Sequence, residues 1–386
     1  MASLMMEENP FVTAGRIKPA YFCDRTQESR QLIDTLTNGN NLVLFSPRRM
    51  GKTGLIAHCF NSDAVCTACH TIYVDILPTT SLQEFTYALG RAVFESLLPR
   101  QQRLRQRFVQ MLKSVSGKMG FDPVTGLPTF SLEMGDITQP EVTLAEIFQC
   151  LERADRPCWV AVDEFQQIGR YAEKNVEALL RSHIQQVTNC RFVFAGSERH
   201  LIEEMFLASA RPFYNSAELM ELKPIPEAVY SDFVIQRMKD RSRRVVPDVI
   251  HWLYQLFEGN TYCLQQTFHK AFDLTPRGEE CTEKRVREAI ELILDSREFY
   301  AKELLSQLSP SQKALLYAVA RDGVSRNVTS AAFIGRHKLA SASSVQGAVR
   351  SLLARDLLTE TAKTYRVSDP FFRLWLVRFI KGKTAL

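Results

Sequence analysis

Long apolar runs are absent from this 386-residue chain. A membrane-spanning helix needs about 18 consecutive apolar residues, and no stretch of that kind occurs, so the sequence predicts no membrane span. The segment Met1–Pro10 also lacks the basic start and apolar centre of a signal peptide. We therefore expect a cytoplasmic protein with no membrane partner.

Glycine, proline and cysteine are scarce as well, at 17, 16 and 9 residues. So few glycines and prolines exclude a fibrous or low-complexity chain, while 45% hydrophobic residues are enough for buried cores. Nine cysteines are an odd number in a chain without a signal peptide, which indicates reduced thiols. The length favours two or three domains.

The net charge of +5 is unevenly distributed. Pro310–Leu386 holds thirteen Lys or Arg residues and four acidic residues, so it carries +9 and the rest of the chain −4. A second stretch, Arg100–Lys118, has six basic residues and no acid. We interpret residues 100–140 as a surface insertion, either a solvated helix face followed by a loop around Gly117–Pro128, or a contact for nucleic acid or a partner.

Short apolar runs alternate with longer amphipathic ones before residue 225, as in a parallel sheet with crossover helices. The predicted strands are Asn41–Phe45, Thr71–Leu77, Cys158–Val162, Arg191–Ala195 and Leu219–Leu222. The predicted helices are Thr53–Phe60, Ser81–Leu98, Glu141–Arg153, Glu173–Val187 and Arg199–Leu207. This pattern predicts an α/β nucleotide-binding domain over residues 1–225.

Helices alone are predicted next, with no strand pattern between them. They are Glu227–Arg241, Pro247–Phe257, Tyr262–Phe272 and one long helix, Thr282–Leu308, and they define an all-α domain over 226–308. From 309 to 386 the pattern predicts three short helices, a hairpin over Leu357–Ser368 and a last helix through Phe371–Ile380. This is the layout of a winged helix-turn-helix.

The strongest motif is SPRRMGKT, Ser46–Thr53, which lies between a predicted strand and a predicted helix, as a phosphate-binding P-loop does. In such a loop backbone N–H groups surround the phosphates, Lys52 reaches the β- and γ-phosphates, and the Thr53 hydroxyl ligates Mg²⁺. Ser46 stands where the usual pattern has glycine. The residues expected to bind the nucleotide are Ser46, Pro47, Arg48, Arg49, Met50, Gly51, Lys52, Thr53 and Gly54.

Two acids, Asp163 and Glu164, come directly after a buried strand. One carboxylate can hold Mg²⁺ through water, and the next can orient or deprotonate an attacking water. A kinase transfers the phosphoryl group to a substrate hydroxyl and does not need the second acid. The pair therefore favours an NTPase, with Thr53 and Asp163 at the metal and Glu164 as the catalytic base.

Five segments together resemble one family: SPRRMGKT, VDEFQQI, FAGSERHLIEEMF, RPFYNSAELMEL and SDPFFRLWL. Through them nearly the whole chain is similar to the archaeal-type ATPases of the STAND class, which are relatives of AAA+ enzymes. The resemblance implies an α/β P-loop NTPase domain with an AAA+-like parallel sheet, an all-α lid and a C-terminal winged helix-turn-helix. It also implies ATP and Mg²⁺ as cofactors, and it matches Ser197 to the polar sensor of the γ-phosphate.

The same resemblance extends to three further segments. Glu258–Gln265 is similar to the lid motif of the family, and Phe22–Glu28, which contains Arg25, to the segment that flanks the adenine. Relatives carry Gly-Arg where this chain has Asn215-Ser216. The nearest arginine, Arg211, is either an arginine finger that acts catalytically across a subunit interface or a plain exposed arginine.

The sequence Cys66-Thr67-Ala68-Cys69-His70 fits a haem-attachment pattern, but that chemistry belongs to exported proteins. With Cys59 these residues offer zinc ligands, yet no second ligand pair follows at finger spacing. We interpret the cysteines as structural thiols.

Two functions fit the sequence. One is a switch that hydrolyses ATP to ADP and phosphate with Mg²⁺ and associates with double-stranded DNA. In that case Ser343, Ser344, Gln346 and Arg350 project from the recognition helix, and Lys363 and Arg366 lie on the wing. The other is a nucleotide-dependent signalling or defence switch that acts on a protein partner or in a homo-oligomer without binding nucleic acid.

Overall fold

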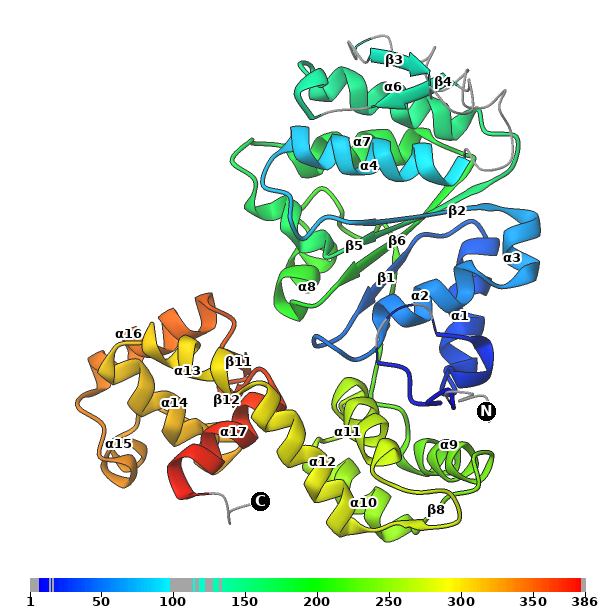
Figure 1. Ribbon diagram of the computed structural model, residues 1–386. Coiled ribbons are helices and arrows are strands. Elements are labelled where there is room, and N and C mark those ends of the chain that lie inside the picture. Colours follow the sequence, from blue (N-terminus) through cyan, green and yellow to red (C-terminus); the bar gives the residue numbers. More distant parts are fainter. Residues whose placement is uncertain are drawn as a thin grey trace. The chain divides into compact units, whose positions relative to one another are not determined.

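The computed structural model describes residues 7–13, 15, 17–97, 114, 118–121, 128–131 and 134–382. Figure 1 shows the two compact units into which the chain folds, Arg16–Ile225 and Pro226–Leu386. The segment up to Gly15 belongs with the second unit, where Phe11 is fully buried and its ring stacks 5.6 Å from that of Phe268. No helix in these ranges combines the length and the apolar character that crossing a bilayer requires.

A five-stranded parallel sheet forms the centre of the first unit, in the order β2-β5-β6-β1-β7. Its strands are β1 (Leu42–Phe45), β2 (His70–Asp75), β5 (Cys158–Asp163), β6 (Cys190–Gly196) and β7 (Glu218–Glu221). All five predicted strands are thus confirmed. Parallel strands joined by helices are buried on both faces, which explains why they are nearly continuous apolar runs.

Helices cover both faces of this sheet, as Figure 1 shows. One layer contains α4 (Leu82–Leu97), α6 (Pro140–Glu152), α7 (Val176–Gln186) and α8 (Arg199–Leu207). The other contains α1 (Thr26–Thr37), α2 (Lys52–Phe60) and α3 (Asp63–Ala68), and short 3₁₀ turns lie at Pro19–Tyr21, Met134–Asp136 and, as η3, Phe165–Arg170. Because side chains alternate along a strand, Val43 packs into the first layer and Leu44 into the second.

The insertion region contains two strands, β3 (Lys118–Phe121) and β4 (Pro128–Ser131), which pair antiparallel. The prediction of a loop around Gly117–Pro128 is therefore wrong for Lys118–Phe121 and for Pro128, which lie in strands. Five of the basic residues noted there, namely Arg100, Arg103, Arg105, Arg107 and Lys113, lie outside the described residues.

The second unit begins with helices α9 (Glu227–Lys239), α10 (Pro247–Leu256), α11 (Thr261–Asp273), α12 (Glu283–Ser296) and α13 (Glu298–Ser306). The prediction of a single helix over Thr282–Leu308 is wrong, because the helix is interrupted at Arg297. There the guanidinium donates to the Tyr262 hydroxyl at 3.0 Å and pairs with Asp369 at 3.5 Å. Two short strands that the sequence did not indicate, β8 (Arg244–Val245) and β9 (Glu280–Cys281), pair in parallel.

The winged helix predicted from the sequence is confirmed. It contains α14 (Pro310–Asp322), β10 (Ser325–Arg326), α15 (Ala331–His337), α16 (Ala342–Ala354), β11 (Leu358–Thr361), β12 (Thr364–Val367) and α17 (Pro370–Lys381). Serine side chains cap three of these helices, since Ser309, Ser330 and Ser341 each accept the N–H three residues on. Strand β10, which pairs with β12, was not predicted.

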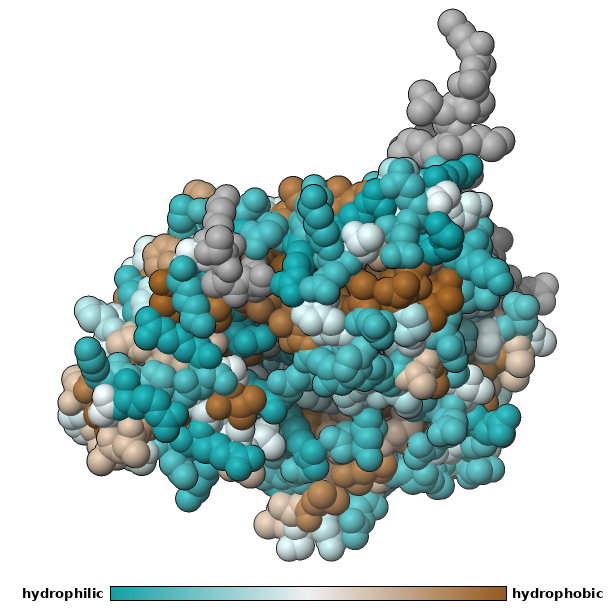
Figure 2. Space-filling view, turned by 90° about the horizontal axis from the view of Figure 1, so that it is seen from below, coloured by the Kyte–Doolittle hydropathy of each residue, from teal (hydrophilic) through white to brown (hydrophobic). Residues whose placement is uncertain are grey.

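Ion pairs and aromatic contacts join the winged helix to the preceding helices within this unit. Arg378 on α17 is only 6% exposed and donates to Glu291 and Asp295 of α12, at 2.7 Å each. The rings of Phe257 and Phe371 pack edge to face with centroids 5.0 Å apart. On the face drawn in Figure 2 the surface is mostly hydrophilic, and apolar residues form separate patches.

Gly196, the last residue of β6, has no room for a side chain. A Cβ there would lie 2.6 Å from Gln166 Oε1 and 2.6 Å from the Ile202 side chain. We expect Gly196→Ala to lower the free energy of unfolding by about 1–3 kcal/mol because the added methyl overpacks this contact.

Urea unfolding followed by circular dichroism measures this change. Gly347→Ala on α16 is the control, since a Cβ there meets no atom within 4 Å, and it should be neutral or stabilising by at most about 1 kcal/mol. Equal stabilities of the two variants would contradict the proposed crowding.

Candidate functional site

The carboxyl ends of four parallel strands bring three of the predicted residues, and Asp75, which was not predicted, to one edge of the sheet. Ser46 follows β1, Asp163 ends β5, Ser197 follows β6 and Asp75 ends β2. Ligands of open α/β sheets bind at this edge. The sheet therefore gathers residues that are more than 100 positions apart in the sequence.

The P-loop turns between β1 and α2 at two residues in the left-handed region, Arg49 (φ 67°) and Gly51 (φ 98°). Ser46 does not adopt a positive φ, so serine is sterically tolerated where the usual pattern has glycine. Its N–H donates to the Gly196 carbonyl at 3.3 Å, which joins the loop to β6. Helix α2 begins at Lys52, and the positive end of its dipole faces the loop.

Lys52 folds its side chain back inside this loop. The ammonium donates to the Ser46 carbonyl at 3.0 Å and the Pro47 carbonyl at 3.4 Å, and the residue is 6% exposed. Burial lowers its pKa, although the charges of Glu164 and Asp163 oppose this. Neutral carbonyls are weaker partners for a cation than phosphate oxygens, so the loop fits an anionic ligand.

Asp163 is held by three donors. Its Oδ2 accepts from the Thr53 hydroxyl at 2.8 Å and from the Tyr73 hydroxyl at 2.6 Å, and its Oδ1 accepts from the Glu164 N–H at 3.0 Å. A hydroxyl and a carboxylate in contact are oxygen ligands of the kind that Mg²⁺ prefers. Thr53 and Asp163 thus fit the predicted metal site.

The predicted base, Glu164, and the predicted sensor, Ser197, are joined by a hydrogen bond. Glu164 (φ 57°) accepts from the Ser197 hydroxyl and from Gln166 Nε2 through the same oxygen, Oε2, at 2.6 Å each. A second contact joins the same two segments, because Arg170 at the end of η3 donates to both carboxylate oxygens of Glu198, the residue after Ser197, at 2.6 and 2.8 Å. The η3 segment and the loop after β6 therefore form one hydrogen-bonded group.

Sequence reasoning missed Tyr73 and Asp75 on β2. Asp75 lies opposite Asp163 in the parallel register. Burial raises the pKa of Asp75, and the charges of Asp163 and Glu164 raise it further. The sequence did contain a signal for these two residues. Alternation along the predicted strand Thr71–Leu77 puts both of them on one face, near the carboxyl end of the strand.

Arg25 contacts the P-loop through a buried hydrogen bond. Its guanidinium, 4% exposed, donates to the carbonyls of Met50 at 3.2 Å and Lys223 at 2.7 Å, and also pairs with Glu28. Nearby, a Cβ on Gly54 would lie 4.0 Å from the Phe22 ring, which stacks on His58 with centroids 4.0 Å apart. The segment expected to flank the adenine thus contacts the first turns of α2.

Arg211 lies apart from these contacts, after α8. Its guanidinium pairs with Glu177 at 2.5 Å and Glu204 at 3.6 Å. Burial raises the pKa of Glu177, and the charge of Arg211 opposes that shift. Within the chain the residue is thus a half-buried ion-pair partner.

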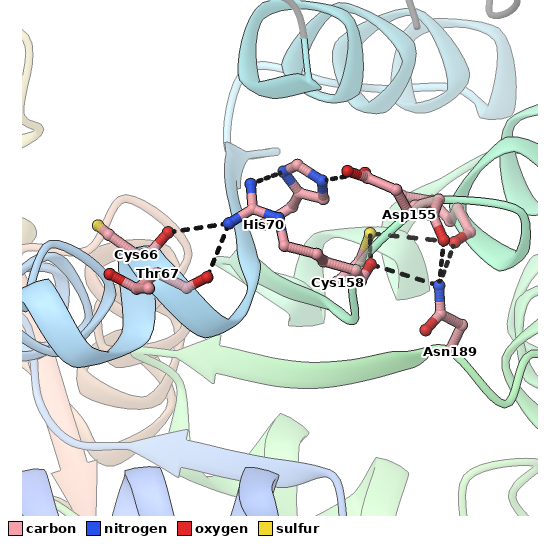
Figure 3. A network of polar contacts seen from close by, with 9 residues as sticks. Cys66, Thr67, His70, Asp155, Cys158 and Asn189 are labelled. Atoms are coloured by element: carbon pink, nitrogen blue, oxygen red, sulfur yellow. Dashed lines mark hydrogen bonds and ion pairs between the residues drawn. The ribbon is translucent and has the colours of Figure 1, made fainter. Parts of the chain in front are cut away.

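The cysteine-rich segment lies at the opposite, amino end of the strands (Figure 3). There Arg156 donates to the Thr67 carbonyl at 2.9 Å and to His70 Nδ1 at 3.2 Å, while His70 Nε2 bonds Asp155 at 2.7 Å. All nine cysteines are free thiols, and no metal-binding group of three His, Cys, Asp or Glu residues occurs in the described part of the chain. This network fastens α3 and β2 to the start of β5.

Comparisons with known proteins agree with this architecture. A family described as a probable winged helix domain matches residues 299–378. A Walker-type ATPase of Pyrococcus abyssi superposes with a TM-score of 0.64 at 18% identity, over 95% of this chain and 99% of that chain. No curated protein matches the chain.

Two proteins of Aeropyrum pernix also superpose over nearly their whole length. The ORC2 protein, in ADPNP–ADP complexes, gives a TM-score of 0.57 at 15% identity and 99% coverage of both chains. The ORC1 protein, in complex with DNA, gives 0.52 at 15% identity and 98% coverage of both. The chain thus has an α/β P-loop ATPase fold followed by a helical region and a winged helix.

Proposed function

We propose that this chain is a Mg²⁺-dependent ATPase that acts as a switch and associates with DNA through its winged helix. The observation that carries the proposal is the buried Lys52 ammonium inside the P-loop. The next residue, Thr53, donates a hydrogen bond to Asp163. Cation, hydroxyl, carboxylate and adjacent base are the parts that phosphoryl transfer to water needs.

Each residue has a defined task in this reaction. Lys52 exchanges the Ser46 and Pro47 carbonyls for oxygens of the β- and γ-phosphates. Thr53 and Asp163 would hold Mg²⁺, which would neutralise the charge that develops on the phosphates. Glu164 takes a proton from water as the water oxygen bonds to the γ-phosphorus and the bond to the β–γ bridging oxygen breaks, giving ADP and phosphate.

Ser197 connects the presence of the γ-phosphate to the base. A hydroxyl has one hydrogen to donate, and in this structure Ser197 donates it to Glu164. If Ser197 instead donates to the γ-phosphate, Glu164 Oε2 loses one of its two donors, and the freed lone pair can accept a hydrogen bond from water. Nucleotide binding and activation of the base are thus one event.

DNA association is supported by the exposed residues of the helix-turn-helix. On α16, Ser343, Gln346 and Arg350 are exposed and Ser344 is half-buried. Basic side chains are also exposed around it, at Arg326, Arg336, Lys338 and Lys363. The similarity in fold to an ORC1 protein in complex with DNA supports the same use.

Two observations favour the alternative, a switch that acts on a protein partner. The wing residue Arg366 forms an ion pair with Glu258 of the expected lid motif, so this wing charge is already neutralised within the chain. Phe299 and Tyr300 on α13 are 82% and 64% exposed, as residues at a protein interface are.

Finer assignments rest on the sequence motifs. We propose that the chain is a member of the STAND class, with a lid at 226–308 and the winged helix at 309–386. In a homo-oligomer Arg211 is the candidate for contact with the nucleotide of a neighbouring subunit.

The test of the ATPase is Glu164→Gln. We expect this variant to bind ATP as the wild type does and to hydrolyse it about 10²–10⁴-fold more slowly, because the amide keeps the shape and loses the base. Equilibrium ATP binding and phosphate release in Mg²⁺ measure the two properties separately.

Two further variants make the result specific. Glu141→Gln, an exposed acid on α6, should leave both properties unchanged. Lys52→Ala should weaken ATP binding by at least about tenfold, because it removes a charge-assisted contact. Normal hydrolysis by Glu164→Gln would refute the assigned base, and normal binding by Lys52→Ala would refute the P-loop.

The full chain should bind duplex DNA with an affinity that falls steeply with salt. Arg350→Ala should reduce the slope of log K against log[salt] by about 1, the change expected for one lost phosphate contact. Arg91→Ala, which removes an exposed arginine from α4, is the control and should leave the slope unchanged. Absence of binding at low salt would favour the protein-directed switch.

A further inference from the structure

We propose that Tyr73 is a positioning residue for the metal-binding carboxylate of Asp163, an inference that rests on the function proposed above. Tyr73 lies on β2, outside the P-loop and outside the acidic pair Asp163–Glu164 at the end of β5. Its hydroxyl donates to Asp163 Oδ2 at 2.6 Å, a shorter bond than that of Thr53 to the same oxygen.

The sheet register places the two residues together. Strands β2 and β5 are parallel neighbours in which Tyr73 is paired with Ala161, and Asp75 with Asp163. Since residues two apart share a face, Tyr73 and Asp163 lie on the same side of the sheet. That side is the one covered by α2, which begins with Lys52 and Thr53.

The number of free lone pairs on Asp163 shows how the hydrogen bond from Tyr73 restrains this carboxylate. A carboxylate offers about four lone-pair positions. Thr53 and Tyr73 fill those of Oδ2, and the Glu164 N–H fills one of Oδ1. One position is left, on Oδ1, so the carboxylate would have a single defined direction in which to hold the metal ion.

Tyr73 provides this restraint independently of the nucleotide. The hydroxyl donates its own proton to Asp163 Oδ2, so the bond needs no bound nucleotide. Thr53 belongs to the P-loop and also has to give a lone pair to the metal. The phenol belongs to β2 and has no such second task, so it keeps Asp163 oriented before Mg²⁺ arrives.

The test is Tyr73→Phe in the full chain, with ATP binding measured in EDTA and during a Mg²⁺ titration. Loss of a group that orients a metal ligand weakens metal affinity by about 10–100-fold. We expect the half-saturating Mg²⁺ concentration in the presence of ATP to rise by about tenfold or more, while ATP affinity in EDTA is unchanged. Mn²⁺ binding with ATP, followed by electron paramagnetic resonance, should show the same shift.

The matched control is Tyr171→Phe, which removes another phenol of the same unit. The Tyr171 hydroxyl bonds Thr79 at 2.5 Å, away from Asp163, and this variant should keep the wild-type Mg²⁺ dependence. An unchanged Mg²⁺ titration in Tyr73→Phe would overturn the inference. An equal loss of ATP affinity with and without Mg²⁺ would also overturn it, as a general structural effect.

Failure of the proposed function gives a different result. In that case the wild type itself would bind no ATP at any Mg²⁺ concentration, and both proposals would fall together. If the wild type binds ATP in a Mg²⁺-dependent way and Tyr73→Phe behaves identically, only the role of Tyr73 is refuted.

Discussion

The hydrogen bond from Thr53 to Asp163 is the contact on which the rest of the site depends. Strands β1 and β5 are not neighbours, because β6 lies between them, so this bond is what fastens the helix after the P-loop to the acidic end of β5. It places Lys52, one residue earlier, and Glu164, one residue later, at the same edge of the sheet. The Lys52 cation, the proposed metal-holding residues and the proposed base are thereby assembled from two short sequence segments.

From this contact, hydrogen bonds lead to the parts that a switch would move. Glu164 accepts a hydrogen bond from Ser197, and Glu198 accepts one from Arg170, so the proposed base is tied to the loop after β6. In the second unit, Arg378 and the Phe257–Phe371 contact hold the winged helix on α12 and the end of α10. The winged helix is therefore expected to follow any movement of those helices as one body.

Much of this was predictable because local signals and global fold agree. Apolar runs revealed the five parallel strands, and the motif around Lys52 with the acids after β5 revealed the edge where they converge. Tyr73 and Asp75 were missed because their importance comes from the register of β2 against β5, which no local motif reports. The break at Arg297 was missed for the same reason, since its partners Tyr262 and Asp369 lie 35 and 72 residues away. Strand β10 is too short to leave a pattern.

The central claim is that the P-loop is a binding site for the phosphates of ATP, with the metal at Thr53 and Asp163. A crystal structure with a non-hydrolysable ATP analogue and Mg²⁺ tests it most directly. The account predicts that Lys52 leaves the Ser46 carbonyl, to which it now donates at 3.0 Å, and donates to the β- and γ-phosphates instead. The Thr53 hydroxyl should then ligate Mg²⁺. An analogue bound elsewhere, with Lys52 still on the Ser46 carbonyl, would contradict the account.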